Sequence, residues 1–216
     1  HDAIAREATL GADLILFETF IDLQEMRAAL LAAKAACDLP VFCQMTYEAN
    51  GRTVTGTDPA TAAIVLDKLG ASVIGANCSL GPEQLLEVVK TYHQYTEKPI
   101  SIQPNAGLPI FQNGETIFPM TPQEMAHWAP KLIEAGASYL GGCCGTTPIH
   151  ITAMKEACEN QTSPKAEPPA GLWLASRTRN LPLGHQFAPR LIGERINPTG
   201  KKALAQSLRD GNLLMV

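Results

Sequence analysis

The sequence predicts an α/β protein in which parallel strands alternate with helices. Short, nearly continuous apolar runs recur about every 30 residues, the length of one βα unit, and each is followed by a stretch of helical character. Polar and sulfur-bearing residues gather where these runs end. A (β/α)8 barrel carries its chemistry at the carboxyl ends of its strands. These observations therefore favour a TIM barrel.

Five strands are expected. LILFET (14–19), VIGANC (73–78) and YLGGCC (139–144) each follow a Gly-Ala-Asp or Gly-Ala-Ser triplet. PVFCQMTYE (40–48) and PISIQPNAG (99–107) each begin at a proline. Glycine in the triplets suits the left-handed end of a helix. Because a closed barrel has eight units, the sequence predicts only about the last five βα units, preceded by a helix and by about three units that lie upstream.

Helices are expected over roughly 22–36, 58–69, 82–96, 122–135 and 148–159. Asp22 opens the first of them as a capping residue. Asp58, Thr121 and Thr147 each stand directly before a proline, and a capping residue followed by proline at the first helical position is a strong start signal. No G-x-G-x-x-G motif follows the first strand, so a dinucleotide-binding fold has no support.

The chain changes character after residue 160. QTSPKAEPPAG is polar and rich in proline, which predicts an extended linker over 161–190. RLIGERINPTGKKALAQSL then has the pattern of a strand, a loop and a helix start. We therefore expect residues 1–160 to be the C-terminal part of one barrel and 191–216 to begin a second domain.

Composition excludes several classes of protein. The net charge of −4 gives no basic field for nucleic acid, and no apolar run is long enough to span a membrane. Six cysteines in 216 residues are too few for a disulfide scaffold, and the first residues do not resemble a secretion signal. A reducing, cytoplasmic location is expected. The absent initiator methionine suggests a piece of a longer chain.

Three cysteines stand at strand ends and form the main candidate site. Cys78 ends VIGANC, and the adjacent Cys143 and Cys144 end YLGGCC. Adjacent cysteines rarely form an unstrained disulfide, whereas three thiolates with one open position suit a catalytic zinc. Small buried cysteines also serve as core filler. That packing role is the one expected for the remaining three, Cys37, Cys43 and Cys158.

The other candidates have weaker signals. Glu18 ends the first strand, where a carboxylate could hold an ammonium group, act as a base, or simply face solvent. Asn105 in QPNAG could shape a loop or contact substrate. His93 and His127 lie within predicted helices and are expected to pack or face solvent. His150 lies near the cysteine pair, and a role on the helix face is favoured for it.

A zinc with three thiolate ligands carries much negative charge and is a poor source of hydroxide. It is better suited to bind a further thiol and lower its pKa, so alkyl transfer to a thiol is the natural reaction class. GANCSLGP and GGCCGTTP, with the FET strand end, resemble the homocysteine S-methyltransferase family of zinc-dependent (β/α)8 barrels. The resemblance covers about residues 1–160. It implies Cys78, Cys143 and Cys144 as zinc ligands and Glu18 as a contact for the homocysteine amino group.

A second motif points to one branch of that family. IGERINPTGKK resembles the first strand of the pterin-binding barrel that follows the homocysteine barrel in cobalamin-dependent methionine synthases. The resemblance implies methylcobalamin, carried by another module, as the immediate methyl donor and methyltetrahydrofolate as the methyl source. Residues that would bind the pterin are not identified. The 216 residues alone are expected to be inactive because the barrel is open.

Two alternatives remain at this point. The barrel could take its methyl group directly from a small donor such as betaine or S-methylmethionine. From another class, the three cysteines could belong to a structural or redox-sensing zinc module that is closed by a fourth protein ligand, with Cys43 or His150 as the expected fourth.

Overall fold

In a computed structural model, the described residues are 2–191, 193 and 199–211, and contacts divide the chain after Pro182. Each unit is described by itself. The elements of the first unit, which ends within β9, are α1 (Asp2–Thr9), β1 (Ile15–Phe20), α2 (Leu23–Ala36), β2 (Val41–Met45), α3 (Pro59–Leu69), β3 (Val73–Asn77), α4 (Pro82–Tyr95), β4 (Ile100–Gln103), β5 (Ile110–Gln112), β6 (Glu115–Ile117), α5 (Pro122–Glu134), β7 (Ala137–Leu140), α6 (Pro148–Ala157), β8 (Leu172–Ala175) and β9 (Asn180–Leu183).

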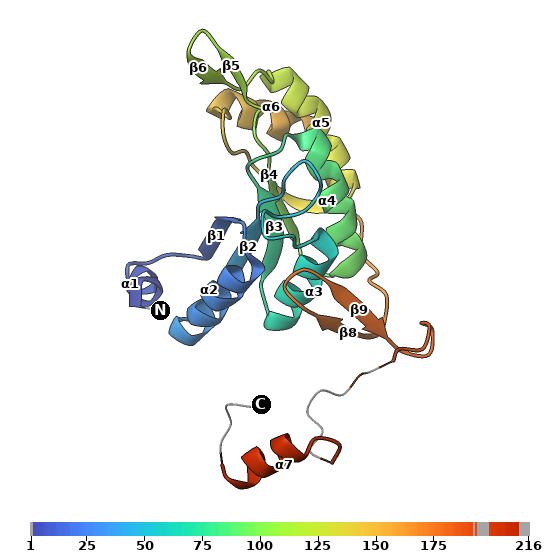
Figure 1. Cartoon of the computed structure of the whole chain (residues 1–216). Helices are drawn as coiled ribbons and strands as arrows, with labels where there is room; N and C mark the ends of the chain where they lie inside the picture. Colours follow the sequence, from blue (N-terminus) through green and yellow to red (C-terminus); the bar gives the residue numbers. More distant parts are fainter. Residues whose placement is uncertain (1, 192, 194–198, 212–216) are drawn as a thin grey trace. The chain divides into compact units, whose positions relative to one another are not determined.

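The five expected strands form one parallel sheet in the order β1-β2-β3-β4-β7, with β1 and β7 at its edges (Figure 1). Each strand lies beside its neighbour in the chain order of the βα units, as in the wall of a barrel. The predicted α/β class and the partial barrel are confirmed. The expected helices also appear, each within two residues of the predicted ends.

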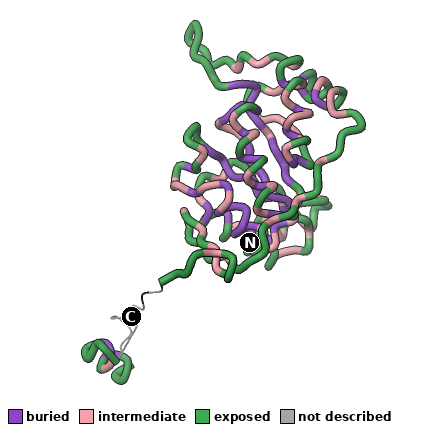
Figure 2. Tube along the Cα trace, turned by 90° about the vertical axis from the view of Figure 1, so that its right-hand side faces the viewer, coloured by how far each residue is buried: buried purple, intermediate pink, exposed green. Residues whose placement is uncertain are grey.

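One face of the sheet packs against helices and holds the main core. Figure 2 shows the buried segments running through the interior of this unit. Alternate strand residues, among them Cys43, Ile74 and Ile102, are buried here. They pack with side chains of α2, α3, α4 and α5, represented by Leu30 and Val89. The strands thus place alternate apolar residues on this face, where the helices cover them.

The opposite face of the sheet is concave. Phe42 of β2 and Tyr139 of β7 have ring centroids only 5.3 Å apart, although β3 and β4 lie between their strands. In a flat sheet, three strand spacings would separate them by about 14 Å. Small residues occupy the strands between: a Cβ at Gly75 would collide with the Ser101 carbonyl oxygen. Gln44 reaches across this position, and its Nε2 donates to Ser101 Oγ at 2.7 Å.

Local chemistry explains where the helices begin. Asp58 accepts from the Thr61 backbone N–H at 2.8 Å, and Thr121 accepts from the Glu124 N–H at 3.3 Å. The Glu124 carboxylate in turn accepts from the Thr121 N–H at 2.7 Å, which completes a capping box. These bonds satisfy backbone donors that a helix start leaves without intrahelical partners.

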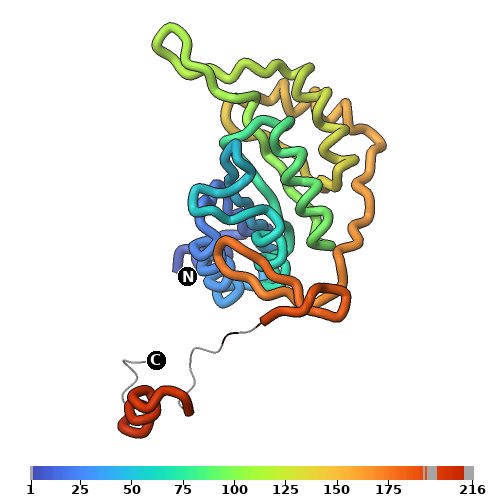
Figure 3. The backbone as a smooth tube through the Cα atoms, turned by 45° about the vertical axis from the view of Figure 1, so that its right-hand side comes forward, coloured from blue at the N-terminus to red at the C-terminus, as the bar shows by residue number. Residues whose placement is uncertain are grey.

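Two small sheets were not expected from the sequence. β5 and β6 form an antiparallel hairpin that projects from the end of the sheet where the strands finish (Figure 1 and Figure 3). Asn113 and Gly114 at its turn both have positive φ, 52° and 88°, which is the signature of a two-residue type I′ turn. The Asn-Gly pair is thus a local hairpin signal, although no element was expected between the strand at 99–107 and the helix at 122–135.

The predicted extended linker differs from the structure over 172–183, where β8 and β9 pair and lie beside α3 (Figure 3). Thr57 Oγ1 donates to the Arg177 carbonyl at 2.7 Å, and Asn180 Nδ2 donates to Thr61 Oγ1 at 3.0 Å. Trp173 packs edge-on against Tyr95. Such polar and aromatic anchors hold a segment that proline content alone marks as extended. The domain boundaries at 160 and 190 stay a prediction.

The second unit contains α7 (Lys202–Arg209), which matches the helix start expected from KALAQSL. The expected first strand of a pterin-binding domain, in the IGERINP stretch, lies mostly outside the described residues and stays a prediction. Among the described residues, no helix combines the length and apolar character needed to cross a membrane.

Candidate metal centre

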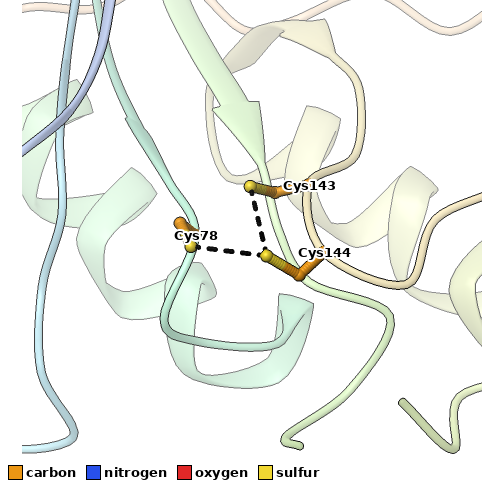
Figure 4. Close-up of side chains that lie close together, drawn as sticks. All are labelled: Cys78, Cys143 and Cys144. Carbon is orange, nitrogen blue, oxygen red and sulfur yellow. Dashed lines mark hydrogen bonds between the residues drawn. The ribbon is translucent and has the colours of Figure 1, made fainter. Parts of the chain in front are cut away.

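The three strand-end cysteines converge. Cys78 Sγ lies 3.8 Å from Cys144 Sγ, and Cys143 Sγ lies 4.0 Å from Cys144 Sγ (Figure 4). All three sulfurs are within 4.8 Å of one another. Tetrahedral zinc with Zn–S bonds of about 2.3 Å requires sulfurs about 3.8 Å apart. The spacing therefore fits one zinc ion, with Cys144 exposed and the other two half-buried.

Cys78 is aimed by an unusual backbone at the end of β3. Its φ is 62° and that of Ser79 is 58°, so the chain turns sharply away from the strand direction. The Cys78 N–H still donates to the Gln103 carbonyl of β4 at 3.1 Å, which keeps the residue tied to the sheet edge. Left-handed backbone at non-glycine residues is uncommon and concentrates at functional sites.

The loop that carries the cysteine pair is fixed by the neighbouring strand end. Cys143 N–H donates to the Pro104 carbonyl at 2.8 Å, and the Cys144 carbonyl accepts from the Ala106 N–H at 2.9 Å. A Cβ on Gly142 would collide with the Thr146 side chain. Gly145 has φ 78°, and a Cβ there would collide with Phe118. Glycine is thus required for this tight loop to present both sulfurs on one side.

Asn105 takes part in the same loop. Its side-chain Oδ1 accepts from the Cys144 N–H at 3.1 Å, and its own N–H donates to the Leu80 carbonyl at 3.0 Å. The residue is buried. Of the two roles that the sequence left open, shaping the loop has direct support from these bonds. A contact with substrate stays a prediction.

The surroundings of Cys143 and Cys144 favour the protonated form of both thiols. Burial is the main cause that raises the pKa of Cys143 to about 12, and the neighbouring Cys78 and Cys144 add to it. Burial and Cys78 also raise the pKa of Cys144. Several thiolates this close together repel one another, so a cation among them is needed for them to ionise together.

The residues considered as a fourth protein ligand lie elsewhere. The Nδ1 of His150 accepts from the Thr147 N–H at 3.2 Å at the start of α6, and its Nε2 is 3.0 Å from the Met120 carbonyl oxygen. Both ring nitrogens are therefore engaged. Cys43 is fully buried on the helix-covered face, and burial raises its pKa to about 12. Among the described residues, the group able to hold a metal ion consists of Cys78, Cys143 and Cys144.

The remaining cysteines and histidines are distributed as expected. Cys37 and Cys158 are half-buried at the ends of α2 and α6. His93 lies on α4, where its ring would collide with a Cβ on Gly136. His127 is exposed on α5, and its Nε2 lies 2.9 Å from Lys131 Nζ. None of the four belongs to the sulfur cluster.

Glu18 is exposed near the carboxyl end of β1, where the strand is irregular. The pairing with β2 shifts register between Phe17 and Phe20, and Thr19 has φ 64°.

Buried Asn77, the residue before Cys78, joins this bulge to the cysteines. Its side chain bonds the Thr19 backbone and hydroxyl and lies 3.8 Å from Cys143 Sγ. The sequence placed Asn77 at a strand end but gave it no role. The signal in the sequence that could have indicated a role for Asn77 is its position: a polar amide in an apolar strand, directly before a candidate ligand cysteine.

Comparison with known proteins identifies the family of this chain. The family described as homocysteine S-methyltransferase matches residues 1–158. Methionine synthase of Mycobacterium tuberculosis is 33% identical over 204 residues, which cover 92% of this chain and 17% of that protein. Methionine synthase of Mycobacterium leprae is 33% identical over 212 residues, again 92% and 17%. The chain thus spans about a sixth of the length of these relatives.

Solved structures give the same result for the fold. The homocysteine methyltransferase MmuM from Escherichia coli in its apo form has a TM-score of 0.57 and 23% identity, covering 72% of this chain and 57% of that one. Its metallated form has a TM-score of 0.57 and 25% identity, covering 72% of this chain and 51% of that one. The match to only part of a larger chain agrees with a partial barrel.

Proposed function

This chain belongs to the homocysteine S-methyltransferase family, and from that premise we propose that it is the zinc-bearing, homocysteine-binding part of a methionine synthase. The observation that carries the proposal is the spacing of the Cys78, Cys143 and Cys144 sulfurs, which fits one tetrahedral ion with a position left for substrate. An all-sulfur donor set favours zinc over magnesium or calcium.

The three cysteines would hold the ion, and the chain's other residues would prepare them. Bound there, zinc would lower the pKa of the homocysteine thiol so that it reacts as a thiolate. The Pro104 carbonyl and the Asn105 side chain fix the Cys143–Cys144 loop through the two backbone N–H groups. Half-burial of Cys78 and Cys143 limits water around the sulfurs. Exposure of Cys144 leaves one side of the cluster open for a substrate sulfur.

Glu18 is proposed to bind the amino group of homocysteine. Its carboxylate is exposed, and the backbone of the next residue, Thr19, is held to Asn77 beside the cysteines. An amino acid bound through its sulfur could therefore meet a carboxylate from the first strand. Asn105 is proposed as a second contact for homocysteine. Because its side chain is buried at the cysteine loop, we expect it to contribute less to substrate binding than Glu18 does.

For the methyl donor we propose methylcobalamin, supplied by another module, with methyltetrahydrofolate as the methyl source. Support comes from the extent of similarity: the methionine synthase relatives match 92% of this chain, whereas the family match ends at residue 158. Similarity thus continues into 161–216, where the beginning of a pterin-binding domain is proposed at 191.

We propose a cytoplasmic location for the protein, because the free thiols of the site suit a reducing compartment.

The test is metal content together with the sulfur count around the metal. Single Cys78→Ala, Cys143→Ala and Cys144→Ala variants should each lose most bound zinc, because two thiolates hold the ion far less well than three. Cys37→Ala serves as the matched control and should keep it. Stoichiometric zinc in all three variants would refute the assignment. X-ray absorption should then show one added sulfur with homocysteine, whereas a structural or redox-sensing site would show none.

The donor is tested by supplying methylcobalamin, betaine or S-methylmethionine to a polypeptide that contains this chain and about three upstream βα units. Of these three donors, only methylcobalamin should support methyl transfer to homocysteine. Turnover with betaine or S-methylmethionine would instead place the protein with the relatives that use small donors.

A further inference from the structure

Asn77 contacts three parts of the sheet edge through one buried side chain. It is the last residue of β3 and has no exposed surface. Its Oδ1 accepts from the Thr19 N–H at 2.7 Å, its Nδ2 donates to Thr19 Oγ1 at 2.9 Å, and the same Nδ2 lies 3.8 Å from Cys143 Sγ. Its backbone carbonyl accepts from Thr46 Oγ1 at 3.1 Å. The amide thus joins β1, β3 and the cysteine loop.

The orientation of this amide is fixed by a group that can only donate. A backbone N–H has no lone pair to offer, so the Thr19 N–H must face the Asn77 oxygen. The NH2 group is then directed to the other side, where Thr19 Oγ1 and Cys143 Sγ lie. Its two hydrogens match these two acceptors. A flipped amide would leave both the Thr19 N–H and the sulfur without a complementary partner.

Thr19 is held in an unfavourable conformation by the same contacts. A β-branched residue rarely adopts positive φ, and Thr19 has φ 64° at the point where β1 loses its regular pairing with β2. Asn77 reaches this bulge from β3, across the intervening strand β2. Strain of this kind persists where the surroundings over-determine it, and such sites are frequently functional.

We propose that Asn77 is a positioning residue of the metal centre, donating an N–H to the Cys143 sulfur while the Thr19 backbone holds the amide in the donating orientation. This inference rests on the proposed zinc site. A hydrogen bond to a thiolate withdraws negative charge from the sulfur and fixes its direction, as outer groups do around other metal ligands. It would also keep the Glu18-bearing bulge at a set distance from the metal.

The experiment measures zinc affinity by chelator competition and the sulfur-to-metal charge-transfer band of the cobalt(II) form, using the full chain. Asn77→Leu should weaken zinc binding by roughly 10- to 100-fold, the usual effect of losing such a partner. Asn77→Asp keeps both bonds to Thr19, because the Thr19 hydroxyl can donate to the second carboxylate oxygen. This variant is therefore expected to fold even if Asn77→Leu does not. Loss of the N–H donor in either variant should move the cobalt band to longer wavelength.

Two controls separate this role from general loosening. Thr19→Ala keeps the Thr19 N–H that orients the amide, so its cobalt band should match the wild type. Thr96→Val removes a buried hydroxyl that bonds Asp67 and the Lys98 N–H and is outside the metal centre. It should lower stability and leave the band unchanged.

A folded Asn77→Asp variant with a wild-type band, or an equal shift in Thr19→Ala, would overturn the inference while the zinc site stands. A wild-type chain that binds neither zinc nor cobalt would overturn both the inference and the proposed function.

Discussion

Glu18 differs from the sulfur cluster in chemistry and in position. Its possible ligand atoms are carboxylate oxygens, whereas the three cysteine sulfurs already provide the ligand set that suits the metal. Its side chain is exposed at the irregular end of β1. We expect Glu18→Gln to weaken homocysteine binding by roughly 10- to 100-fold, because a charged hydrogen-bond partner contributes about 1.5–3 kcal/mol. Zinc content should hold. Calorimetric titration with homocysteine and metal analysis of the same sample test both statements, and loss of zinc would move Glu18 into the metal's ligand set.

The three cysteines outside the cluster are expected to affect stability alone. Cys43 is fully buried, and Cys37 and Cys158 are half-buried. Replacement of Cys43 by Ala should cost about 1–3 kcal/mol by leaving a small cavity, with lesser effects at the other two. Denaturant unfolding gives these values. Abolished methyl transfer in a folded, zinc-loaded Cys43→Ala variant of the complete barrel would contradict the packing role.

At the scale of single elements, the cysteine loop depends on Gly145. Alanine there would take a left-handed backbone, at a cost of about 1–2 kcal/mol, and would also collide with Phe118. We expect Gly145→Ala to displace the loop and weaken zinc binding measurably in chelator competition.

Gly11→Ala is the matched control for this loop. Gly11 has φ 88° with no atom within 4 Å of the added Cβ, and it precedes β1 at the other end of the sheet. The control should lose about the same backbone energy without any change in zinc affinity. Equal affinities in Gly145→Ala and the wild type would show that the loop tolerates a side chain.

Local signals explain which elements the sequence predicted. A cap residue followed by proline marks the starts of α3, α5 and α6, and this chemistry is complete within four residues, so it can be recognised without tertiary structure. The β5–β6 hairpin has an equally local signal, Asn113-Gly114, although no element was expected there. β8 and β9 had none of comparable strength, because these four-residue strands depend on bonds from Arg177 and Asn180 to the distant Thr57 and Thr61.

The candidate site was predictable where it depends on strand ends and not where it depends on curvature. Cys78, Cys143 and Cys144 follow the ends of the parallel strands β3 and β7, and such strand ends meet at one edge of the sheet. The link from Asn77 to Thr19 crosses the strand between them, so it exists only because the sheet bends toward that side. No periodicity in the sequence encodes such a bend.

For the molecule as a whole, the open sheet predicts an inactive chain. β1 and β7 are the edges of the five-stranded sheet, and the nearby Leu16 and Tyr139 are 40% and 47% exposed. Unpaired strand edges and bare apolar surface favour aggregation, and a cavity without its remaining wall admits water to the thiolate. We expect residues 1–216 alone to show no methylcobalamin-dependent methylation of homocysteine.

An extended polypeptide with about three more βα units ahead of residue 1 should restore the activity. The comparison requires equal zinc loading of both proteins, since the three cysteines are present in each. Equal turnover by the two would show that five units suffice and that the expected unit count is wrong.

The contact between Phe42 and Tyr139 also bears on the order of folding. Closing a barrel joins its first and last strands, and that long-range pairing carries the largest loop-closure entropy of the whole fold. Here the two rings already meet across β3 and β4, and Gly75 leaves room for that bend. The further strands that would complete a barrel would pair with the edges of a five-stranded sheet that is already bent. The slow step of assembly would then be the search for strand register rather than the bending of the sheet.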